Sequence, residues 1–178
     1  MKTDVKTSRG SYPVYIERGA LSRTAGIIGT EHRAFIVTDS GVPEQWTDTV
    51  RAQLPGAELY VFPQGEASKN METWQSILKA MLNANISRND TLVAIGGGVS
   101  GDMGGFAAAC YMRGIRFVNI PTTALSQVDS SIGGKTAIDL AGVKNCVGAF
   151  WQPDAVIVDP QVLSTLPPRH LKSGLAEA

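Results

Sequence analysis

The sequence predicts an α/β fold of the Rossmann-like, doubly wound type, in which a mostly parallel sheet carries helices on both faces and follows an N-terminal hairpin. Short apolar runs of strand length alternate with segments whose apolar residues recur at helical spacing, which is typical of a parallel sheet. Several runs end in aspartate, glycine or threonine, as strands do where they enter a loop. The 178 residues are 43% hydrophobic, so we expect one domain over residues 1–178 with its own core.

The elements follow in order from local patterns. Val5–Arg18 alternates around residues 8–11 and predicts a hairpin, which a helix-like stretch follows. Apolar runs predict the strands of the sheet at residues 34–38, 58–62, 91–95, 116–120 and 155–159. Helices are predicted near Pro43–Leu54, over residues 71–82 with Asn70 as N-cap, from near Gly101 to Tyr111, and from near Pro168. Residues 124–150 break the alternation and predict an irregular hairpin.

The most informative segment is Gly96–Asp102, where three successive glycines directly follow a predicted strand. Glycine adopts positive φ without a Cβ clash, and backbone N–H groups ahead of a helix that starts near Gly101 favour an anion such as a phosphate. The spacing Gly96-x-Gly98-x-x-Gly101 matches the dinucleotide fingerprint. However, it does not follow the first strand, and no acidic residue ends the next strand, so a nucleotide would bind in a non-standard way. The alternative is a tight turn between strand and helix.

Polar side chains at the ends of other predicted strands extend this candidate site. Asp39 could accept hydrogen bonds from a ribose diol, or it could form an ordinary Asx-turn. Glu66 and Lys69 follow the next predicted strand. Because ligands of open α/β sheets bind outside the carboxyl ends of the strands, we expect Asp39, Glu66 and the glycine segment to meet at one edge.

Two lysines in the irregular region point to an anionic ligand. Lys135 follows two glycines, Lys144 precedes an asparagine, and both have few acidic neighbours in the sequence. We therefore predict that they bind phosphate or carboxylate. The alternative is that they are two exposed loop lysines.

Composition argues against several other functions. Sixteen basic and sixteen acidic residues cancel, so we expect neither nucleic acid nor a membrane surface as a partner. The chain begins without an apolar leader and has no apolar stretch near the ~18 residues of a membrane span, so we expect a cytoplasmic location. Cys110 and Cys146 lack metal-ligand spacing and are predicted to be small core residues. His32 and His170 lack a second ligand at helical spacing and do not indicate a metal site by themselves.

The chain resembles the 3-dehydroquinate synthase family across its whole length. The resemblance rests on several motifs in order: Gly65-Glu66-x-x-Lys69, Gly96–Asp102, Tyr111–Gly114, Pro121–Thr123, Gln127–Thr136, Lys144-Asn145, Gln152-Pro153 and Gly174–Glu177. It implies a lyase of the shikimate pathway, which leads to chorismate and the aromatic amino acids. That enzyme converts 3-deoxy-D-arabino-heptulosonate 7-phosphate to 3-dehydroquinate and phosphate, recycles NAD in place and uses a divalent metal, Zn²⁺ or Co²⁺.

The resemblance also implies roles for individual residues. The NAD contacts would be Asp39, Gln64, Gly65, Glu66, Ala67, Ser68, Lys69, Gly97, Gly98, Val99, Ser100, Gly101, Asp102, Thr122, Thr123, Lys135, Lys144, Val162, Leu163, Ser164 and Thr165. The catalytic and substrate-binding residues would be Asp129, Lys135, Lys144 and Asn145, together with Arg113, which would reach the active site of a neighbouring subunit in a homodimer. Glu177 would be a metal ligand.

The chain departs from the family in length. Family members are about twice as long, and their two histidine metal ligands lie in a helical C-terminal domain that has no counterpart here. We therefore expect this half alone to bind NAD weakly and to be inactive. Ser100 and Asp139 stand where an apolar residue or asparagine is expected. The alternatives are a metal-dependent polyol or alcohol dehydrogenase, against which the two lysines argue because a polyol is neutral, and a non-catalytic nucleotide-binding module.

Overall fold

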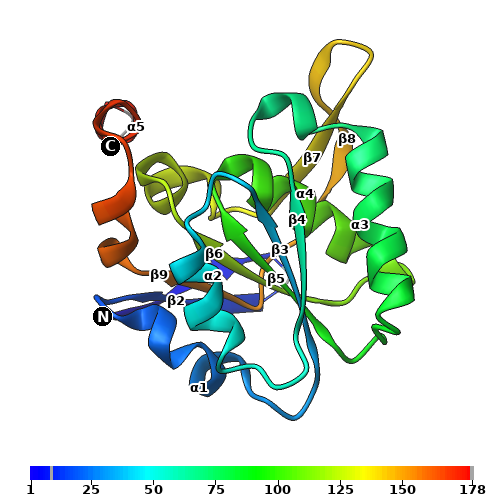
Figure 1. Cartoon of the computed structure of the whole chain (residues 1–178), viewed down its shortest axis with the longest axis horizontal. Helices are drawn as coiled ribbons and strands as arrows, with labels where there is room; N and C mark the ends of the chain where they lie inside the picture. The colour runs from blue at the N-terminus through cyan, green and yellow to red at the C-terminus, as the bar shows by residue number, and fades with distance from the viewer. Residues whose placement is uncertain (9, 177–178) are drawn as a thin grey trace.

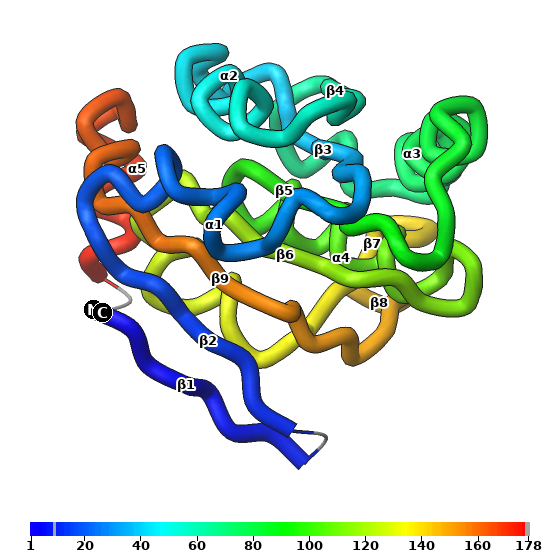
Figure 2. Tube along the Cα trace, turned by 90° about the horizontal axis from the view of Figure 1, so that it is seen from below, coloured from blue at the N-terminus to red at the C-terminus, as the bar shows by residue number. Residues whose placement is uncertain are grey.

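The computed structural model describes residues 1–8 and 10–176 and has three layers, with a seven-stranded sheet between two helical layers (Figure 1). The strands are β1 (Lys2–Thr7), β2 (Gly10–Ile16), β3 (Ala34–Asp39), β4 (Glu58–Phe62), β5 (Thr91–Gly96), β6 (Arg116–Pro121) and β9 (Ala155–Val158). Figure 2 shows their order, β1-β2-β9-β6-β5-β3-β4, from the lower edge to the upper. In this sheet β1 pairs antiparallel with β2, and the remaining pairs are parallel. The predicted α/β fold with an N-terminal hairpin is confirmed.

The helical segments connect these strands. They are η1 (Ala20–Arg23), α1 (Thr24–Ile28), α2 (Glu44–Arg51), η2 (Glu66–Ser68), α3 (Met71–Asn83), α4 (Gly98–Cys110), η3 (Tyr111–Arg113), the π-helical turn η4 (Ser126–Ser130), η5 (Pro160–Thr165) and α5 (Pro168–Leu175). Asn70 caps α3 as predicted, since its side-chain oxygen accepts a hydrogen bond from the Thr73 N–H at 2.9 Å. The predicted start of the next helix near Gly101 is wrong, because α4 begins at Gly98, within the glycine triplet.

Each face of the sheet has its own core. The side chains of β3 alternate between the faces, as the period of two in a strand requires. Phe35 and Val37 belong to a cluster with residues of α3 and α4 on one face, whereas Ile36 belongs to a cluster with residues of α1 and α2 on the other. A smaller cluster around Tyr12 and Val14 seats the N-terminal hairpin against β9.

Helix α4 lies close to the sheet because its inner face is small. A Cβ at Gly104 would lie 2.8 Å from the Ala94 Cβ of β5, and one at Gly105 would lie 3.1 Å from the Phe117 ring of β6. Ala107 and Ala108 are fully buried in the same interface. The predicted close packing of this helix is confirmed.

A second, two-stranded sheet covers α4. Its antiparallel strands β7 (Lys135–Leu140) and β8 (Val143–Phe150) form the hairpin predicted within residues 124–150, with a register shift between Ile138 and Leu140. Ile138 is fully buried in the core cluster shared with α4, which anchors the hairpin. Its tip projects beyond the main sheet in Figure 1.

The prediction that Cys110 and Cys146 are core residues is wrong. Both thiols are exposed. Cys110 is the last residue of α4, where Ala107 and Ala108 already make the buried contacts. Cys146 lies on β8, whose first four residues are all exposed because this part of the hairpin lies outside the core.

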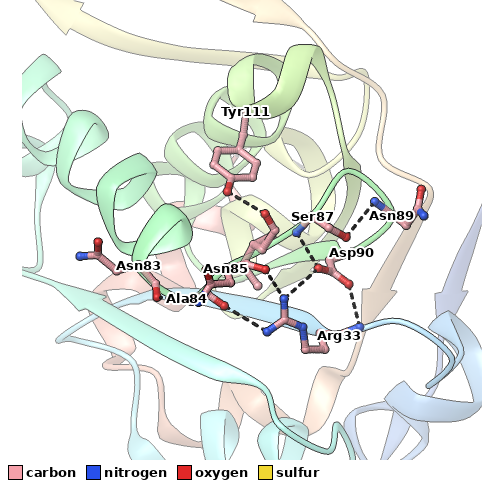
Figure 3. A network of polar contacts seen from close by, with 9 residues as sticks. Arg33, Asn83, Ala84, Asn85, Ser87, Asn89, Asp90 and Tyr111 are labelled. Carbon is pink, nitrogen blue, oxygen red and sulfur yellow. Dashed lines mark hydrogen bonds and ion pairs between the residues drawn. The ribbon is translucent and has the colours of Figure 1, made fainter.

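A polar network holds the amino ends of β3 and β5 together (Figure 3). The Arg33 guanidinium donates to the carbonyls of Ala84, at 3.1 Å, and Asn85, and it lies 3.5 Å from the Asp90 carboxylate. Asp90 also accepts the backbone N–H groups of Ser87, at 2.7 Å, and Arg33, at 3.0 Å. The network fixes the loop between α3 and β5 at one edge of the sheet and leaves the carboxyl edge to the candidate site.

Over residues 1–8 and 10–176, the structure has no helix with the length and apolar character that a bilayer span requires.

Candidate functional site

The carboxyl ends of five parallel strands converge on a pocket of about 390 Å³, which we call the switch-point pocket. From β3 the chain runs outward to β4, and after β5 it runs the opposite way through β6 to β9, so the sheet reverses its direction of growth between β3 and β5. The pocket is lined by Asp39, Gly41, Val42, Pro43, Trp46, Gln64, Gly65, Gly97, Gly98, Val99, Thr122, Thr123, Val162, Thr165, Leu166, Pro167 and His170. The predicted meeting of Asp39 and the glycine segment at one edge is confirmed, whereas Glu66, the third residue of that prediction, does not line the pocket.

The glycine triplet supplies backbone donors to this pocket. Gly97 is the N-cap of α4 and carries no side-chain acceptor, so the first-turn N–H groups and the positive end of a 13-residue helix are available to an anion. Packing also requires these glycines. A Cβ at Gly97 would lie 3.1 Å from the Thr123 methyl carbon, and one at Gly98 would lie 3.2 Å from Ser130 Oγ. The tight turn and the anion site are therefore compatible readings of one segment.

Asp39 ends β3 with its carboxylate held on both oxygens. Oδ1 accepts the Gly41 N–H at 2.9 Å, which is an Asx-turn, and Oδ2 accepts the Ser100 hydroxyl at 2.6 Å. The residue is 9% exposed and lines the pocket. The Asx-turn is confirmed, and it is compatible with the predicted ribose contact, because the turn fixes the carboxylate and leaves acceptor positions for a ligand.

Trp46 belongs to the pocket although the sequence analysis did not single it out. Its indole N–H donates to Thr165 Oγ1 at 2.9 Å and so links α2 to η5 across the pocket. Val42 and Leu166 add apolar surface beside it. The sequence pattern around Trp46 is that of an ordinary amphipathic helix. Its place in the pocket wall depends on η5, which is distant in the sequence and supplies the Thr165 hydroxyl. Of the predicted segment 162–165, Val162 and Thr165 line the pocket, whereas Leu163 and Ser164 do not.

A second pocket of about 460 Å³ lies against the β7–β8 hairpin, and we call it the hairpin pocket. It is lined by Asp102, Asp129, Ser130, Ile132, Lys135, Thr136, Ala137, Asn145, Cys146, Gly148, Ala149 and Phe150. Three of the predicted substrate residues, Asp129, Lys135 and Asn145, therefore share one cavity. The two pockets adjoin where Gly98, which lines the first, approaches Ser130, which lines the second.

Lys69 joins the hairpin to the loop before α3. Its side chain is 5% exposed, and its ammonium lies 2.5 Å from Asp102 Oδ2 and donates to Asn145 Oδ1. The Lys69 carbonyl also accepts the Asp139 N–H at 2.9 Å. The pKa of the Asp102 carboxyl is raised above its ordinary value, chiefly because the group is partly buried. The nearby Lys69 ammonium lowers this pKa, and the Glu66 carboxylate raises it further, so the net shift is upward.

Lys144 and Glu66 pair with each other at the rim. Lys144 Nζ lies 3.1 Å from Glu66 Oε1, with the two side chains 70% and 45% exposed. Neither residue lines the switch-point pocket or the hairpin pocket. Their predicted contacts with cofactor or substrate remain predictions.

Other predicted site residues lie away from the two pockets. Ala67 is exposed in η2, and Ser68 is buried there with its hydroxyl donating to the Pro63 carbonyl at 2.6 Å. Ser100 and Gly101 are buried inside α4. Arg113 is exposed in η3, just before β6 and thus at the opposite edge of the sheet.

Residues 1–8 and 10–176 do not bring together a metal site. Glu177, the predicted metal ligand, lies outside the described residues. Among those that are described, no group of three or more His, Cys, Asp or Glu side chains could hold a metal ion.

The sequence of this chain is similar to those of known enzymes. Residues 59–173 match the family model described as 3-dehydroquinate synthase N-terminal. The chain is 49% identical over 171 residues to the 3-dehydroquinate synthase of Azotobacter vinelandii, an alignment that covers 94% of this chain and 47% of that protein. The chain thus spans about half the length of the curated relatives it matches.

Solved structures of two other synthases are also similar to this chain. The 2-deoxy-scyllo-inosose synthase complexed with carbaglucose-6-phosphate, NAD⁺ and Co²⁺ superimposes with a TM-score of 0.92 at 27% identity, over 99% of this chain and 51% of that one. The 2-epi-5-epi-valiolone synthase of Streptomyces hygroscopicus subsp. jinggangensis, with NAD⁺ and Zn²⁺ bound, gives 0.85 at 33% identity, over 97% and 49%.

Proposed function

Because the chain belongs to the 3-dehydroquinate synthase family, we propose that it is the cofactor-binding half of an enzyme that converts 3-deoxy-D-arabino-heptulosonate 7-phosphate to 3-dehydroquinate and phosphate. The observation that carries the proposal is the switch-point pocket, where the N-terminus of α4 and the Asp39 carboxylate face one cavity at the carboxyl edge of the sheet. A dinucleotide needs both features, donors for its pyrophosphate and an acceptor for a ribose diol.

The residues present fit NAD. The first-turn N–H groups after Gly97 would bind the pyrophosphate, the free acceptor positions of Asp39 would bind ribose hydroxyls, and Thr122 and Thr123 would border the dinucleotide. NAD supplies a reversible hydride acceptor in this chemistry. The sheet edge holds these groups in place without a ligand, because packing and hydrogen bonds within the chain already fix the triplet and Asp39.

The hairpin pocket would receive the substrate. The Lys135 ammonium would attract its phosphate or carboxylate, Asn145 would hydrogen-bond its polar groups, and the Asp129 carboxylate would accept from a hydroxyl. A phosphorylated sugar acid suits this mixture of charge and hydrogen-bonding groups better than a neutral polyol does. Since the two pockets adjoin, substrate in one would lie next to dinucleotide in the other.

Some expectations concern the whole protein. The described residues do not fit a metal site, so no step here depends on Zn²⁺ or Co²⁺. Arg113, exposed at the far edge of the sheet, would serve the active site of a second subunit in a homodimer. Cytoplasmic location remains part of the proposal.

Calorimetry with NAD⁺ tests the proposed function. We expect the wild-type chain to bind NAD⁺ weakly and Asp39→Ala to bind about tenfold more weakly, which is ~1.4 kcal/mol. Thr49→Ala, which removes a hydroxyl from the exposed side of α2, is the control and should bind like the wild type. Absence of binding at millimolar NAD⁺ would contradict the proposal.

An activity assay separates this proposal from the alternatives. The chain alone, supplied with the heptulosonate phosphate, NAD⁺ and Zn²⁺ or Co²⁺, should release no phosphate. Accumulation of NADH with a simple polyol would instead indicate a dehydrogenase, because a synthase returns the hydride.

A further inference from the structure

Ser100 is fully buried in the first turn of α4 and lines neither pocket. Its hydroxyl donates to Asp39 Oδ2 at 2.6 Å, a short bond of the kind that charged acceptors form. We propose that Ser100 is a positioning residue, which acts on the dinucleotide by fixing the Asp39 carboxylate and does not contact the ligand. The inference rests on the proposed function, in which the switch-point pocket binds NAD.

The hydrogen bonds of Asp39 leave an arrangement that suits a diol. A carboxylate has about four acceptor positions, two on each oxygen. The Gly41 N–H takes one position on Oδ1, and Ser100 takes one on Oδ2. Each oxygen therefore keeps a position for one hydroxyl of a ribose. Without the serine hydroxyl the carboxylate would be held on one oxygen only, and its plane would be free to turn.

The first glycine of the triplet makes room for this contact. A Cβ at Gly96 would lie 2.3 Å from Ser100 Oγ and 3.1 Å from Asp39 Oδ2. The same serine belongs to the helix whose N-terminus faces the pocket, so it ties the position of the carboxylate to that of the backbone donors. The glycine, the serine and the aspartate thus form one unit that links the two halves of the proposed dinucleotide site.

A purely structural serine would satisfy a buried carboxylate and have no further effect on the ligand. A double-mutant cycle in NAD⁺ affinity separates the two roles, because a residue that acts only through Asp39 has no effect once Asp39 is removed. The cycle uses Ser100→Ala, Asp39→Ala and the double variant, each titrated with NAD⁺ by calorimetry. Thermal unfolding checks that each variant is folded at the temperature of the titration.

We expect Ser100→Ala to weaken NAD⁺ binding by about tenfold, Asp39→Ala by at least as much, and the double variant to match Asp39→Ala. Ser100→Thr keeps the hydroxyl and should recover most of the affinity, whereas Ser100→Cys, a poor donor of similar size, should behave like Ser100→Ala. Thr24→Val is the control, because it removes another buried hydroxyl, which donates to the Leu21 carbonyl away from both pockets.

Two results would overturn the inference while leaving the proposed function intact. One is wild-type affinity in Ser100→Ala, or in Ser100→Cys if the alanine variant does not fold. The other is a further tenfold loss when Ser100→Ala is added to Asp39→Ala. If the wild-type chain does not bind NAD⁺ at all, both the inference and the proposed function fail.

Discussion

Two carboxylates with opposite pKa shifts, the buried Asp90 and the partly buried Asp102, lie near opposite edges of the sheet. Asp90, at the amino edge, meets donors from Ser87 and Arg33, and Asp102, near the carboxyl edge, meets Lys69. Burial alone would raise the pKa of both carboxyls. For Asp90 the hydrogen bonds outweigh burial and the pKa is lowered, whereas for Asp102 burial prevails and the pKa is raised. The two residues therefore affect stability at opposite ends of the pH range.

Asp90→Asn should destabilise the fold at neutral pH by about 2 kcal/mol, because the charge-assisted hydrogen bonds of the network are lost. A carboxyl with a lowered pKa stabilises above its ordinary value of 3.8 and loses that contribution as pH falls through the folded-state pKa. The difference between variant and wild type should therefore shrink below that pH. Urea unfolding across the acid range measures it, with Asp48→Asn on the exposed side of α2 as control. A pH-independent difference would contradict the assignment.

Lys69→Met should destabilise the chain by about 3 kcal/mol at neutral pH, because it leaves the partly buried Asp102 carboxylate without its cation. The raised pKa of Asp102 means that its contribution is fully present below the ordinary carboxyl pKa and is lost as pH rises through the folded-state value. The effect of Lys69→Met should therefore be smaller at acid pH. Adding Asp102→Asn should recover part of the stability, and Lys79→Met, on an exposed part of α3, should have little effect. Additive losses in the double variant would argue against the pair.

Single residues show where sequence reasoning succeeds. Asp39 and Gly97 line the switch-point pocket, as the strand pattern predicts, because parallel strands bring their carboxyl ends to one edge whatever lies between them. Gln64, Gly65, Thr122 and Thr123, which the family resemblance implied as NAD contacts, line the same pocket, and their contact with NAD stays a prediction. Trp46 and the role of Ser100 were not predictable, since each depends on a contact with a residue distant in the sequence.

At the scale of elements, strands were the easiest to predict. β3, β5 and β6 are short apolar runs buried in the sheet, and β4 is an apolar run at its edge; the observed bounds of all four agree with the predicted ones within a residue. The start of α4 was mispredicted because glycine usually disfavours helices, whereas here all three glycines have close neighbours, Gly97 is the N-cap and Gly98 begins the first turn. At this position, packing against neighbouring residues outweighs the low helix propensity of glycine.

The β7–β8 hairpin depends on one glycine for its pairing. A Cβ at Gly148 would lie 2.0 Å from the Thr136 carbonyl oxygen and 2.7 Å from the Ala137 Cα, both backbone atoms that cannot move without breaking the strand pair. Gly148→Ala should therefore destabilise the chain by about 2–3 kcal/mol and disturb the hairpin pocket.

Gly26→Ala is a matched control for this change. Gly26 lies in α1 with open space around its would-be Cβ, so alanine should be neutral or should stabilise by up to ~1 kcal/mol. Thermal or urea unfolding of the two variants compares them. Equal stability of Gly148→Ala and the wild type would show that the hairpin relaxes more easily than the structure indicates.

At the scale of the whole molecule, two adjoining pockets lie beside α4, one at the carboxyl edge of the sheet and one against the β7–β8 hairpin. The sheet and α4 fix the switch-point pocket, the hairpin bounds the second pocket, and Lys69 connects the loop before α3 to the hairpin. The family resemblance supplied the identities of cofactor and substrate, which the residue pattern alone left at the level of an anionic ligand. The metal site and the second subunit remain proposals.

The most direct test of the account is an amide NMR titration of this chain with NAD⁺. We predict shifts concentrated at residues 39–42, 64–65, 97–100, 122–123 and 162–167, with the amino edge around Arg33 and Asp90 unaffected. Absence of shifts at millimolar NAD⁺, or shifts centred on the amino edge, would contradict the central claim that the switch-point pocket is a dinucleotide site.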